Sequence, residues 1–288
     1  MRFNKAIVPQ PAEDVVCELV GVGELEVGAS HFGAWWSPPA PGTVLARMRR
    51  GCILTQLRKD GVVREVKWSE GGVICLRPAT PRLHTIISGG DVAYSYSAIT
   101  ATAFGGVDAF SLYNLPDVLV GADAAEASSE IEASLLLDSV SDAITRGVCR
   151  RSVAHNLGRI LLRQSTIKPD AGQRVQGIAR VSPALEYLAA HFAEPPDIAA
   201  LASLCCLSPS RFHTVFRQAT GGTPYDALTR HRLERASHLL VTTELGIAEV
   251  GESVGWGDPF HFSRTFKSHY GVSPRAHRVR ARAGLAVL

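Results

Sequence analysis

The sequence lacks any run of about 18 apolar residues, the length that a membrane-spanning helix needs. Its first sixteen residues contain no apolar core of signal-peptide length, and Glu13 and Asp14 come early in the chain. We therefore expect a cytoplasmic protein that has no membrane partner.

The sequence also lacks the spacings of metal and redox sites. Its six cysteines include one adjacent pair but no C-x-x-C motif, so we expect free thiols and neither a zinc site nor a redox pair. The N-terminal half offers only His31 and His84 as imidazoles, whereas a catalytic metal centre needs several imidazoles and a carboxylate that converge. We therefore expect no metal, no cofactor and no enzyme activity.

The chain is long enough for two domains. Its 288 residues are 46% hydrophobic and 20% charged, which is ordinary for a soluble globular protein. Up to about Pro116, short apolar runs alternate with clusters of Gly, Pro, Asp and Ser, a pattern typical of the short strands of a barrel or a sandwich. Asp60 and Gly61 favour a tight hairpin turn because both residue types tolerate a positive φ.

Two amphipathic helices are predicted after the strands. Ser128 or Ser129 is expected to cap the first helix, and the apolar residues of both helices recur at helical spacing. Their apolar stripes either cover the strands or form a dimer seam. The stripes comprise Ile131, Leu135, Leu136 and Val140 in the first helix, and Val153, Leu157, Ile160 and Leu161 in the second.

Residues 166–180 are polar, contain Pro and Gly, and show no apolar period, so we expect a linker there. The rest of the chain has helical periodicity. The predicted organisation is therefore an N-terminal domain over residues 1–165, a linker over 166–180, and an all-α domain over 181–288.

One unit of the all-α region occurs twice, fifty residues apart: Phe212 recurs as Phe262, and Phe216 recurs as Phe266. In each copy a short helix is followed by a turn and a capped second helix that begins with proline. The turn of the second copy is one residue longer. Further matched pairs are Gly221 and Gly271, Pro224 and Pro274, Arg217 and Lys267, Arg230 and Arg280, and Arg232 and Arg282.

Each second helix is predicted to have an apolar inner face and a polar, basic outer face. This is the design of a helix-turn-helix, whose second helix fits the major groove of DNA. Arginine can donate two hydrogen bonds to a guanine edge, while Arg217 and Lys267 are suited to phosphate. The predicted DNA-binding residues are Ser210, Arg211, His213, Thr214 and Arg217 in the first copy, and Phe260, His261, Ser263, Arg264 and Lys267 in the second.

Positive charge is concentrated in this region. Residues 208–282 hold 11 Lys and Arg against six Asp and Glu, a net charge of +5, whereas the whole chain carries +3. Phosphate binding requires such a concentration. The alternative, a helical bundle with solvated basic faces, explains one such motif more easily than two matched copies. A long helix from Pro224 would hold the copies apart, and successive major-groove segments lie about 34 Å apart.

The segments RLERASHLL, IAEVGESVGWGDPFHFSRTFKSHYGVSP and HRVR resemble the DNA-binding domain of the AraC/XylS family of bacterial transcription regulators over residues 181–282. Three positions depart from the family pattern. Gly251 stands where Ala is usual, Trp256 where Phe is usual, and Phe260 where a small polar residue is common. Phe260 either meets a thymine methyl group or packs against the protein.

The resemblance extends more loosely to the N-terminal half, where GGVICLRPATPRLH is similar to the cupin-type barrel of the family's effector-binding and dimerising domain. We expect an apolar pocket with a few polar groups. Arg47 and Arg49 alternate with apolar Ala46 and Met48 along one predicted strand, so the two arginines share a face. Two guanidiniums on one face would favour a carboxylate or phosphate ligand. The candidate effector-binding residues are His31, Trp35, Trp36, Arg47, Arg49, Arg82 and His84.

The sequence thus predicts an α+β protein of two domains. The first is a cupin-like β-barrel with following helices, and the second is all-α, with two helix-turn-helix motifs joined by a long helix. The expected function is a sequence-specific, dimeric transcription regulator controlled by a small-molecule effector. Its expected partners are promoter or operator DNA, a second copy and, if it activates transcription, RNA polymerase. The alternatives are a constitutive DNA-binding regulator, and an enzyme fused to a DNA-binding module, for which no catalytic constellation is found.

Overall fold

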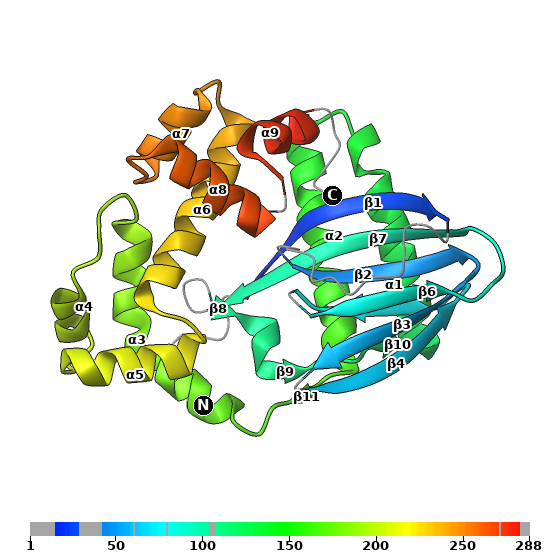
Figure 1. Cartoon of the computed structure of the whole chain (residues 1–288), viewed down its shortest axis with the longest axis horizontal. Helices are drawn as coiled ribbons and strands as arrows, with labels where there is room; N and C mark the ends of the chain where they lie inside the picture. The colour runs from blue at the N-terminus through cyan, green and yellow to red at the C-terminus, as the bar shows by residue number, and fades with distance from the viewer. Residues whose placement is uncertain are drawn as a thin grey trace, which may run out of the picture. The chain divides into compact units, whose positions relative to one another are not determined.

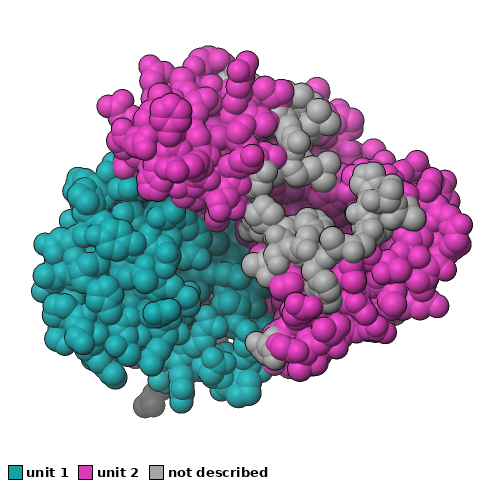
Figure 2. Space-filling view, in the orientation of Figure 1, with its two compact units in different colours: residues 1–16, 101–113, 167–232 teal, residues 17–100, 114–166, 233–288 magenta. Residues whose placement is uncertain are grey.

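The computed structural model describes residues 15–28, 42–59, 61–78, 80–103, 107–270 and 272–282. Strands dominate the first part of the chain and helices the rest (Figure 1). The chain forms two compact units that interleave along the sequence (Figure 2). One unit comprises residues 1–16, 101–113 and 167–232, and the other comprises 17–100, 114–166 and 233–288. The predicted domain boundaries stay a prediction.

Most strands belong to two sheets. The larger sheet has the order β1-β7-β2-β5-β10, with β8 paired to β7, and the smaller sheet has the order β4-β3-β6. A short pair, β9 and β11, is separate. The strands are β1 Val16–Val27, β2 Thr43–Arg50, β3 Cys52–Lys59, β4 Val62–Ser69, β5 Val73–Leu76, β6 Arg82–Ile86, β7 Val92–Ala103, β8 Val107–Asp108, β9 Tyr113–Asn114, β10 Val118–Leu119 and β11 Thr166–Ile167.

The two larger sheets share one apolar core. Ala46 and Met48 of β2 and Ile74 of β5 belong to the same buried cluster as Ile53 and Trp68 of the smaller sheet. Among the described strands the edges of the two sheets do not pair, so the predicted closed barrel is not formed. Alternation along a strand predicts which side chains face a core, whereas closure depends on hydrogen bonds between distant edge strands.

The predicted hairpin is confirmed. β3 pairs antiparallel with β4, with Lys59 opposite Val62. Gly61 has a φ of +78°, the positive value that a two-residue hairpin loop requires, while Asp60 lies outside the described residues.

The first predicted helix begins earlier than expected. α1 spans Gly121–Leu135, so Ser128 and Ser129 lie inside it and the predicted caps are wrong. Their hydroxyls donate to the carbonyls of Ala124 and Ala125, at 2.7 and 3.3 Å. Bonding to the carbonyl four residues earlier lets serine occupy a helix interior.

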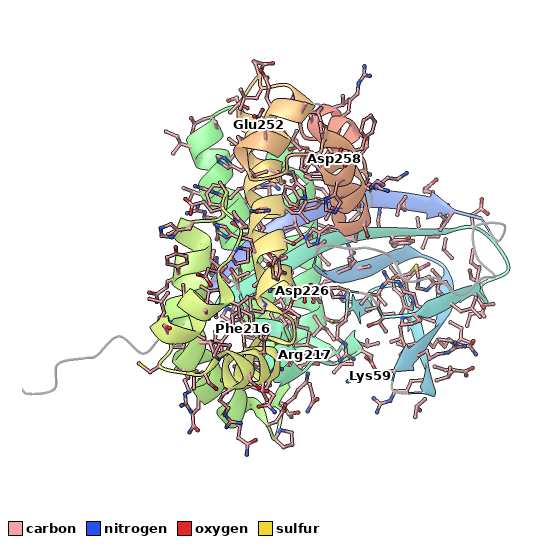
Figure 3. All side chains as sticks on the ribbon, turned by 60° about the vertical axis from the view of Figure 1, so that its left-hand side comes forward. Lys59, Phe216, Arg217, Asp226, Glu252 and Asp258 are labelled. Carbon is pink, nitrogen blue, oxygen red and sulfur yellow. The ribbon has the colours of Figure 1, made fainter. Side chains whose placement is uncertain are left out.

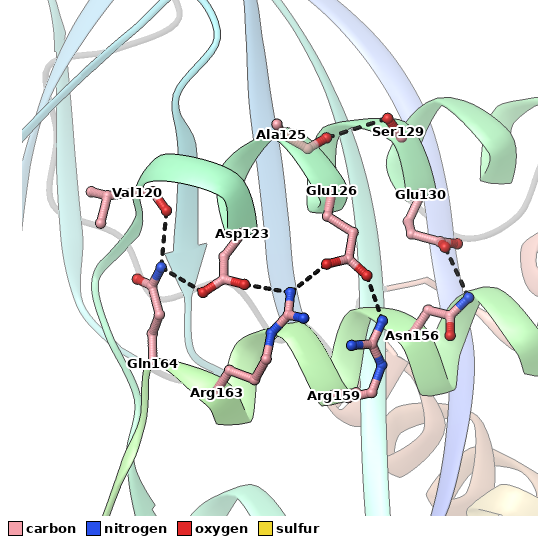
Figure 4. A network of polar contacts seen from close by, with 10 residues as sticks. All are labelled: Val120, Asp123, Ala125, Glu126, Ser129, Glu130, Asn156, Arg159, Arg163 and Gln164. Atoms are coloured by element: carbon pink, nitrogen blue, oxygen red, sulfur yellow. Dashed lines mark hydrogen bonds and ion pairs between the residues drawn. The ribbon is translucent and has the colours of Figure 1, made fainter.

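The predicted stripes are only partly buried. All four residues of the stripe on α2 (Ala143–Arg163) are buried, whereas in the first stripe Ile131 is buried and Leu136, which follows α1, is 67% exposed. Ile131 and Leu157 are fully buried, and α1 packs against α2, β2 and β5. The buried part of the first stripe therefore covers the sheet, while the dimer seam, the second alternative, stays a prediction. A polar network also joins the helices, in which Arg163 pairs with Asp123 and Glu126 (Figure 4).

The later part of the chain is helical from Ala171 onward. Part of the predicted linker over residues 166–180 is therefore helix, because the apolar period of α3 becomes recognisable only at Ile178. The α-helices are α3 Ala171–Ala190, α4 Ile198–Leu204, α5 Pro209–Thr220, α6 Pro224–Thr242, α7 Ile247–Ser253, α8 Pro259–Tyr270 and α9 Pro274–Arg282, and the short 3-10 helices are η2 Ala109–Leu112 and η3 Leu137–Ser139.

Candidate nucleic-acid interface

Helix α5 separates an aromatic inner face from a polar outer face. Phe212 and Phe216 are fully buried, with ring centroids 5.4 Å apart. α3 packs against this helix so closely that a Cβ at Gly177 would lie 3.2 Å from the Cβ of Ala219. Figure 3 marks Phe216 and Arg217 on α5. The predicted contact residues Ser210, Arg211, His213, Thr214 and Arg217 are all exposed.

Helix α8 has the same division. Phe262 and Phe266 are fully buried, with ring centroids 5.7 Å apart, and the ring of Trp256 lies 5.3 Å from that of Phe262. The outer face holds the predicted residues Phe260, His261, Arg264 and Lys267, which are exposed, and Ser263, which is half-buried.

Helices α5 and α8 both begin at their predicted caps. The hydroxyl of Ser208 accepts the backbone N–H of Arg211 at 3.4 Å, and the carboxylate of Asp258 accepts that of Phe260 at 2.9 Å. These caps satisfy backbone donors that a helix start leaves without an intrahelical acceptor. The first turn of each helix, which carries several predicted contact residues, is thereby ordered.

The turns before these helices repeat the same backbone bonds. The N–H of Leu207 donates to the carbonyl of Ala202, and the N–H of Trp256 donates to that of Gly251, each at 2.9 Å. The repeat seen in the sequence is therefore also a repeat of backbone structure. The additional residue, Gly257, follows this bond in the second copy.

The second half of α6 anchors the second copy. The hydroxyl of Ser237 lies 2.9 Å from Nε2 of His277, and the hydroxyl of Tyr270 donates to the carbonyl of Leu233 at 3.3 Å. Arg278 of α9 donates to the carbonyl of Leu240 at 2.9 Å. α8 and α9 are thus held to one side of α6, which leaves the polar face of α8 to solvent.

A second candidate site lies in the core between the two larger sheets. Arg82 and His84, two residues apart on β6, are only 3% and 7% exposed. The Thr55 hydroxyl lies 2.8 Å from Nδ1 of His84 and accepts the indole N–H of Trp68 at 3.0 Å. The sequence analysis missed Thr55 and Trp68. Thr55 lies on the same face of β3 as apolar Ile53 and Leu57, a weak signal that becomes informative only when the pairing of Thr55 with His84 is known.

Burial sets the charges of this cluster. It lowers the pKa of Arg82 to about 10, so the guanidinium remains a cation at pH 7. Burial, with a smaller effect from the charge of Arg82, lowers the pKa of His84 to about 4, so the imidazole is neutral. Burial also raises the pKa of Tyr94, which lies near Arg82 and stays an uncharged phenol. A cation and neutral polar groups therefore face an apolar core.

The other candidate effector residues do not join this cluster. Arg47 and Arg49 share a face of β2, as predicted, but Arg47 pairs with Glu132 and Arg49 pairs with Glu24. Their neighbours Ala46 and Met48 point to the opposite face, into the shared core. His31, Trp35 and Trp36 lie outside the described residues.

The described part of the chain contains no candidate metal centre. No group of three or more His, Cys, Asp or Glu residues is arranged there to hold a metal ion. Likewise, none of the helices in that part is long and apolar enough to cross a membrane.

Comparison with known proteins identifies the helical region. Residues 201–280 match a family model described as a helix-turn-helix domain. Over 101 residues the chain is 42% identical to the arabinose operon regulatory protein of Salmonella typhimurium, covering 35% of this chain and 36% of that protein. These matches support the resemblance of the helical region to the AraC/XylS family.

Other transcription regulators match over a similar part of the chain. The transcriptional activator RhaS of Enterobacter is 34% identical over 123 residues, which cover 41% of this chain and 42% of that protein. A crystal structure of an AraC-type regulator from Chromobacterium violaceum is 27% identical, with a TM-score of 0.35, and the match covers 38% of this chain and 96% of that chain. The chain thus spans well under half the length of these two curated relatives.

The three departures from the AraC/XylS pattern differ in their surroundings. A Cβ at Gly251 would lie 3.0 Å from the ring of Phe262, and the large Trp256 ring packs against the same phenylalanine. Glycine therefore lets the backbone of α7 approach this aromatic cluster closely. Phe260, in contrast, is 80% exposed, so it does not pack against the described residues.

Proposed function

We propose that this chain is a sequence-specific DNA-binding transcription regulator that inserts α5 and α8 into the major groove of double-stranded DNA. The repeated helix pair carries the proposal. In both copies a turn with the same backbone hydrogen bond and a buried aromatic face support an exposed face with basic residues at equivalent positions, Arg217 and Lys267. A major groove admits one such helix, and two helices would read two segments about one helical turn apart.

The exposed residues of each helix differ in side-chain length and in their position along the helix. Arg211 and Arg264 lie nearer the helix start, where a guanidinium can donate two hydrogen bonds to a guanine edge. Arg217 and Lys267 lie later and suit phosphate, which contributes affinity without sequence preference. His213, Thr214, His261 and Ser263 are shorter side chains that would add base contacts.

Selection from random duplexes tests this function. Full-length protein is expected to select a motif of two blocks about one helical turn apart. Arg211→Ala should relax one block and Arg264→Ala the other. Lys59→Ala removes an exposed cation of the strand-rich region (Figure 3) and should leave the motif unchanged. Absence of any selected motif, or relaxation of both blocks by Lys59→Ala, would contradict the proposal.

Control by a small effector is the second part of the proposal. The cluster of Arg82, His84, Thr55 and Tyr94 supports it, because a few polar groups in an apolar core are typical of ligand sites. A buried guanidinium favours an anionic effector such as a carboxylate. The alternative, a constitutive regulator, would bind DNA equally with and without small molecules.

A comparison of carboxylic acids with their amides tests effector control against the constitutive alternative. Acetate, benzoate and octanoate, each compared with its amide, would be tested for effects on the melting temperature and on the DNA Kd. At least one acid is expected to act where its amide does not. Arg82→Gln should abolish that response, while Arg49→Gln, on the other face of the sheet, should keep it. Equal effects of acids and amides would argue against anion recognition, and an invariant DNA Kd would favour the constitutive alternative.

A homodimer, and RNA polymerase as partner of an activator, belong to the same proposal. A seam between two copies would use the exposed apolar residues that directly follow α1 or lie on α2. Leu136, Ile144 and Val148 are 67%, 79% and 63% exposed. Ile144→Asp should shift the chain from dimer to monomer in sedimentation, and an unchanged mass would remove this surface from the proposal.

A further inference from the structure

Phe260 is the exception among the phenylalanines of α5 and α8. Phe212, Phe216, Phe262 and Phe266 are fully buried, whereas Phe260 is 80% exposed. A phenylalanine carries a large apolar surface, and its transfer out of water is strongly favourable. An aromatic ring left in water on the outer face of a candidate reading helix is therefore an unsatisfied contact surface.

Phe260 lies in the first turn of α8. It follows Pro259, and its N–H is held by the carboxylate of Asp258 at 2.9 Å. In an α-helix the Cα–Cβ bond tilts toward the N-terminus, and residues four apart share a face. Phe260 thus shares the outer face with Arg264, at the helix end whose side chains contact base edges when a recognition helix enters the groove.

The corresponding residue of α5 is Ser210, which has a different chemistry. A hydroxyl can donate to or accept from any base edge, but a phenyl ring can do neither. The apolar group that a base pair presents in the major groove is the 5-methyl group of thymine. The two reading helices therefore differ in the kind of base edge that suits their first turn.

We propose that Phe260 contacts the 5-methyl group of a thymine in the DNA block read by α8, and so makes that block depend on thymine. The inference rests on the proposed function and deepens it, because it assigns one base to one side chain. Loss of one buried methyl group is expected to raise the Kd about fourfold, because one apolar carbon is no longer removed from water on binding.

Deoxyuridine supplies the test, because it keeps every hydrogen-bonding group of thymine and lacks the methyl group. Full-length protein would be titrated with the selected duplex and with duplexes in which one thymine at a time is replaced by deoxyuridine. One replacement in the α8 block should raise the Kd about fourfold. For Phe260→Ser, which copies the residue of α5, the thymine and deoxyuridine duplexes should have the same Kd.

Two controls separate this contact from a general loss of binding. Replacement of a thymine in the α5 block should change the Kd of the wild type and of Phe260→Ser by the same factor. Phe260→Leu, which keeps an apolar side chain, should retain part of the preference for thymine. Because Phe260 is exposed, both variants should keep the circular dichroism and melting temperature of the wild type.

Each outcome decides between the two proposals. If the wild type selects a motif but tolerates deoxyuridine at every position of the α8 block, the thymine contact is wrong and the DNA-binding function stands. If Phe260→Ser retains the deoxyuridine effect, another residue makes the methyl contact. If Phe260→Ser instead abolishes binding of a protein partner with no deoxyuridine effect, the ring is a protein-binding surface. If no motif is selected, both proposals fail.

Discussion

Cys206 and Gly255 occupy the same position in the two repeated turns, and both have a left-handed backbone, with φ values of +53° and +89°. Among the described residues Cys206 is the only non-glycine with a positive φ. The turn of a helix pair therefore requires this conformation in both copies. A side chain with a Cβ is strained there, and glycine is not.

Cys206→Gly is expected to stabilise the protein by about 1 kcal/mol, since relief of the left-handed strain exceeds the added entropy of the unfolded chain. Gly255→Ala makes the opposite change in the other copy and should destabilise by about 1 kcal/mol or more. Urea unfolding of the three proteins checks both signs. A destabilising Cys206→Gly would show that contacts of this side chain outweigh the strain.

Thr55→Val is expected to destabilise the strand-rich region by about 1–3 kcal/mol, although valine has nearly the same shape. The hydroxyl of Thr55 accepts the indole N–H of Trp68 and also forms a hydrogen bond with Nδ1 of His84, as donor or acceptor according to the imidazole tautomer. Valine leaves both partners buried without that oxygen. Thr85→Val, at an exposed position of β6, is the matched control and should change stability by less than about 0.5 kcal/mol.

His84 is expected to make stability fall as the pH falls below about 6.5. Its folded pKa is about 4 because of burial, and its unfolded pKa is about 6.5. Above pH 6.5 the imidazole is neutral in both states, and between these values the unfolded chain takes up a proton that the folded chain does not. From pH 7.5 to pH 5.0 the wild type should therefore lose about 2 kcal/mol more unfolding free energy than His84→Gln.

The comparison with His84→Gln isolates this residue. Burial also lowers the pKa of His277, so that residue destabilises the folded state in acid with the same sign. His277 is present in both proteins and its effect cancels from the difference. Parallel pH profiles for the wild type and the variant would show that His84 is not held neutral in the core.

Arg217→Ala and Lys267→Ala are each expected to reduce the slope of log K against log salt by about 0.9, the value of one phosphate contact. The loss should be similar for specific and non-specific duplexes because phosphates carry no sequence information. Binding titrations between 50 and 200 mM salt, about the range in which such slopes are measured, provide the check. Lys59→Ala should keep the wild-type slope; a slope reduced equally in all three variants would point to long-range charge instead.

Local chemistry explains why the helical region was predictable. Ser208 and Asp258 cap α5 and α8, and a proline follows each cap. The buried phenylalanines recur at helical spacing, so the face opposite to them was also predictable. Every one of these signals lies within a few residues of the feature that it predicts.

The predictions that failed needed information that the local sequence pattern does not carry. α1 starts seven residues before Ser128, and the serine hydroxyls bond to carbonyls inside the helix and do not cap it. The strands form separate sheets where a closed barrel was predicted, since local alternation carries no information about edge pairing. Part of the predicted linker is helix, and Lys168 and Arg174 at its polar end donate to the carbonyl of Ser111.

The sequence by itself determined the repeated helix pairs, their caps, their aromatic cores and the polar faces that carry the proposed DNA contacts. All of these follow from period and capping chemistry, which act over a few residues. Only the tertiary structure decided that Arg82 and His84 are buried beside Thr55, and that Arg47 pairs with Glu132. It also decided that Phe260 remains in water. Burial and pairing depend on which distant segments meet, and one strand or helix does not contain that information.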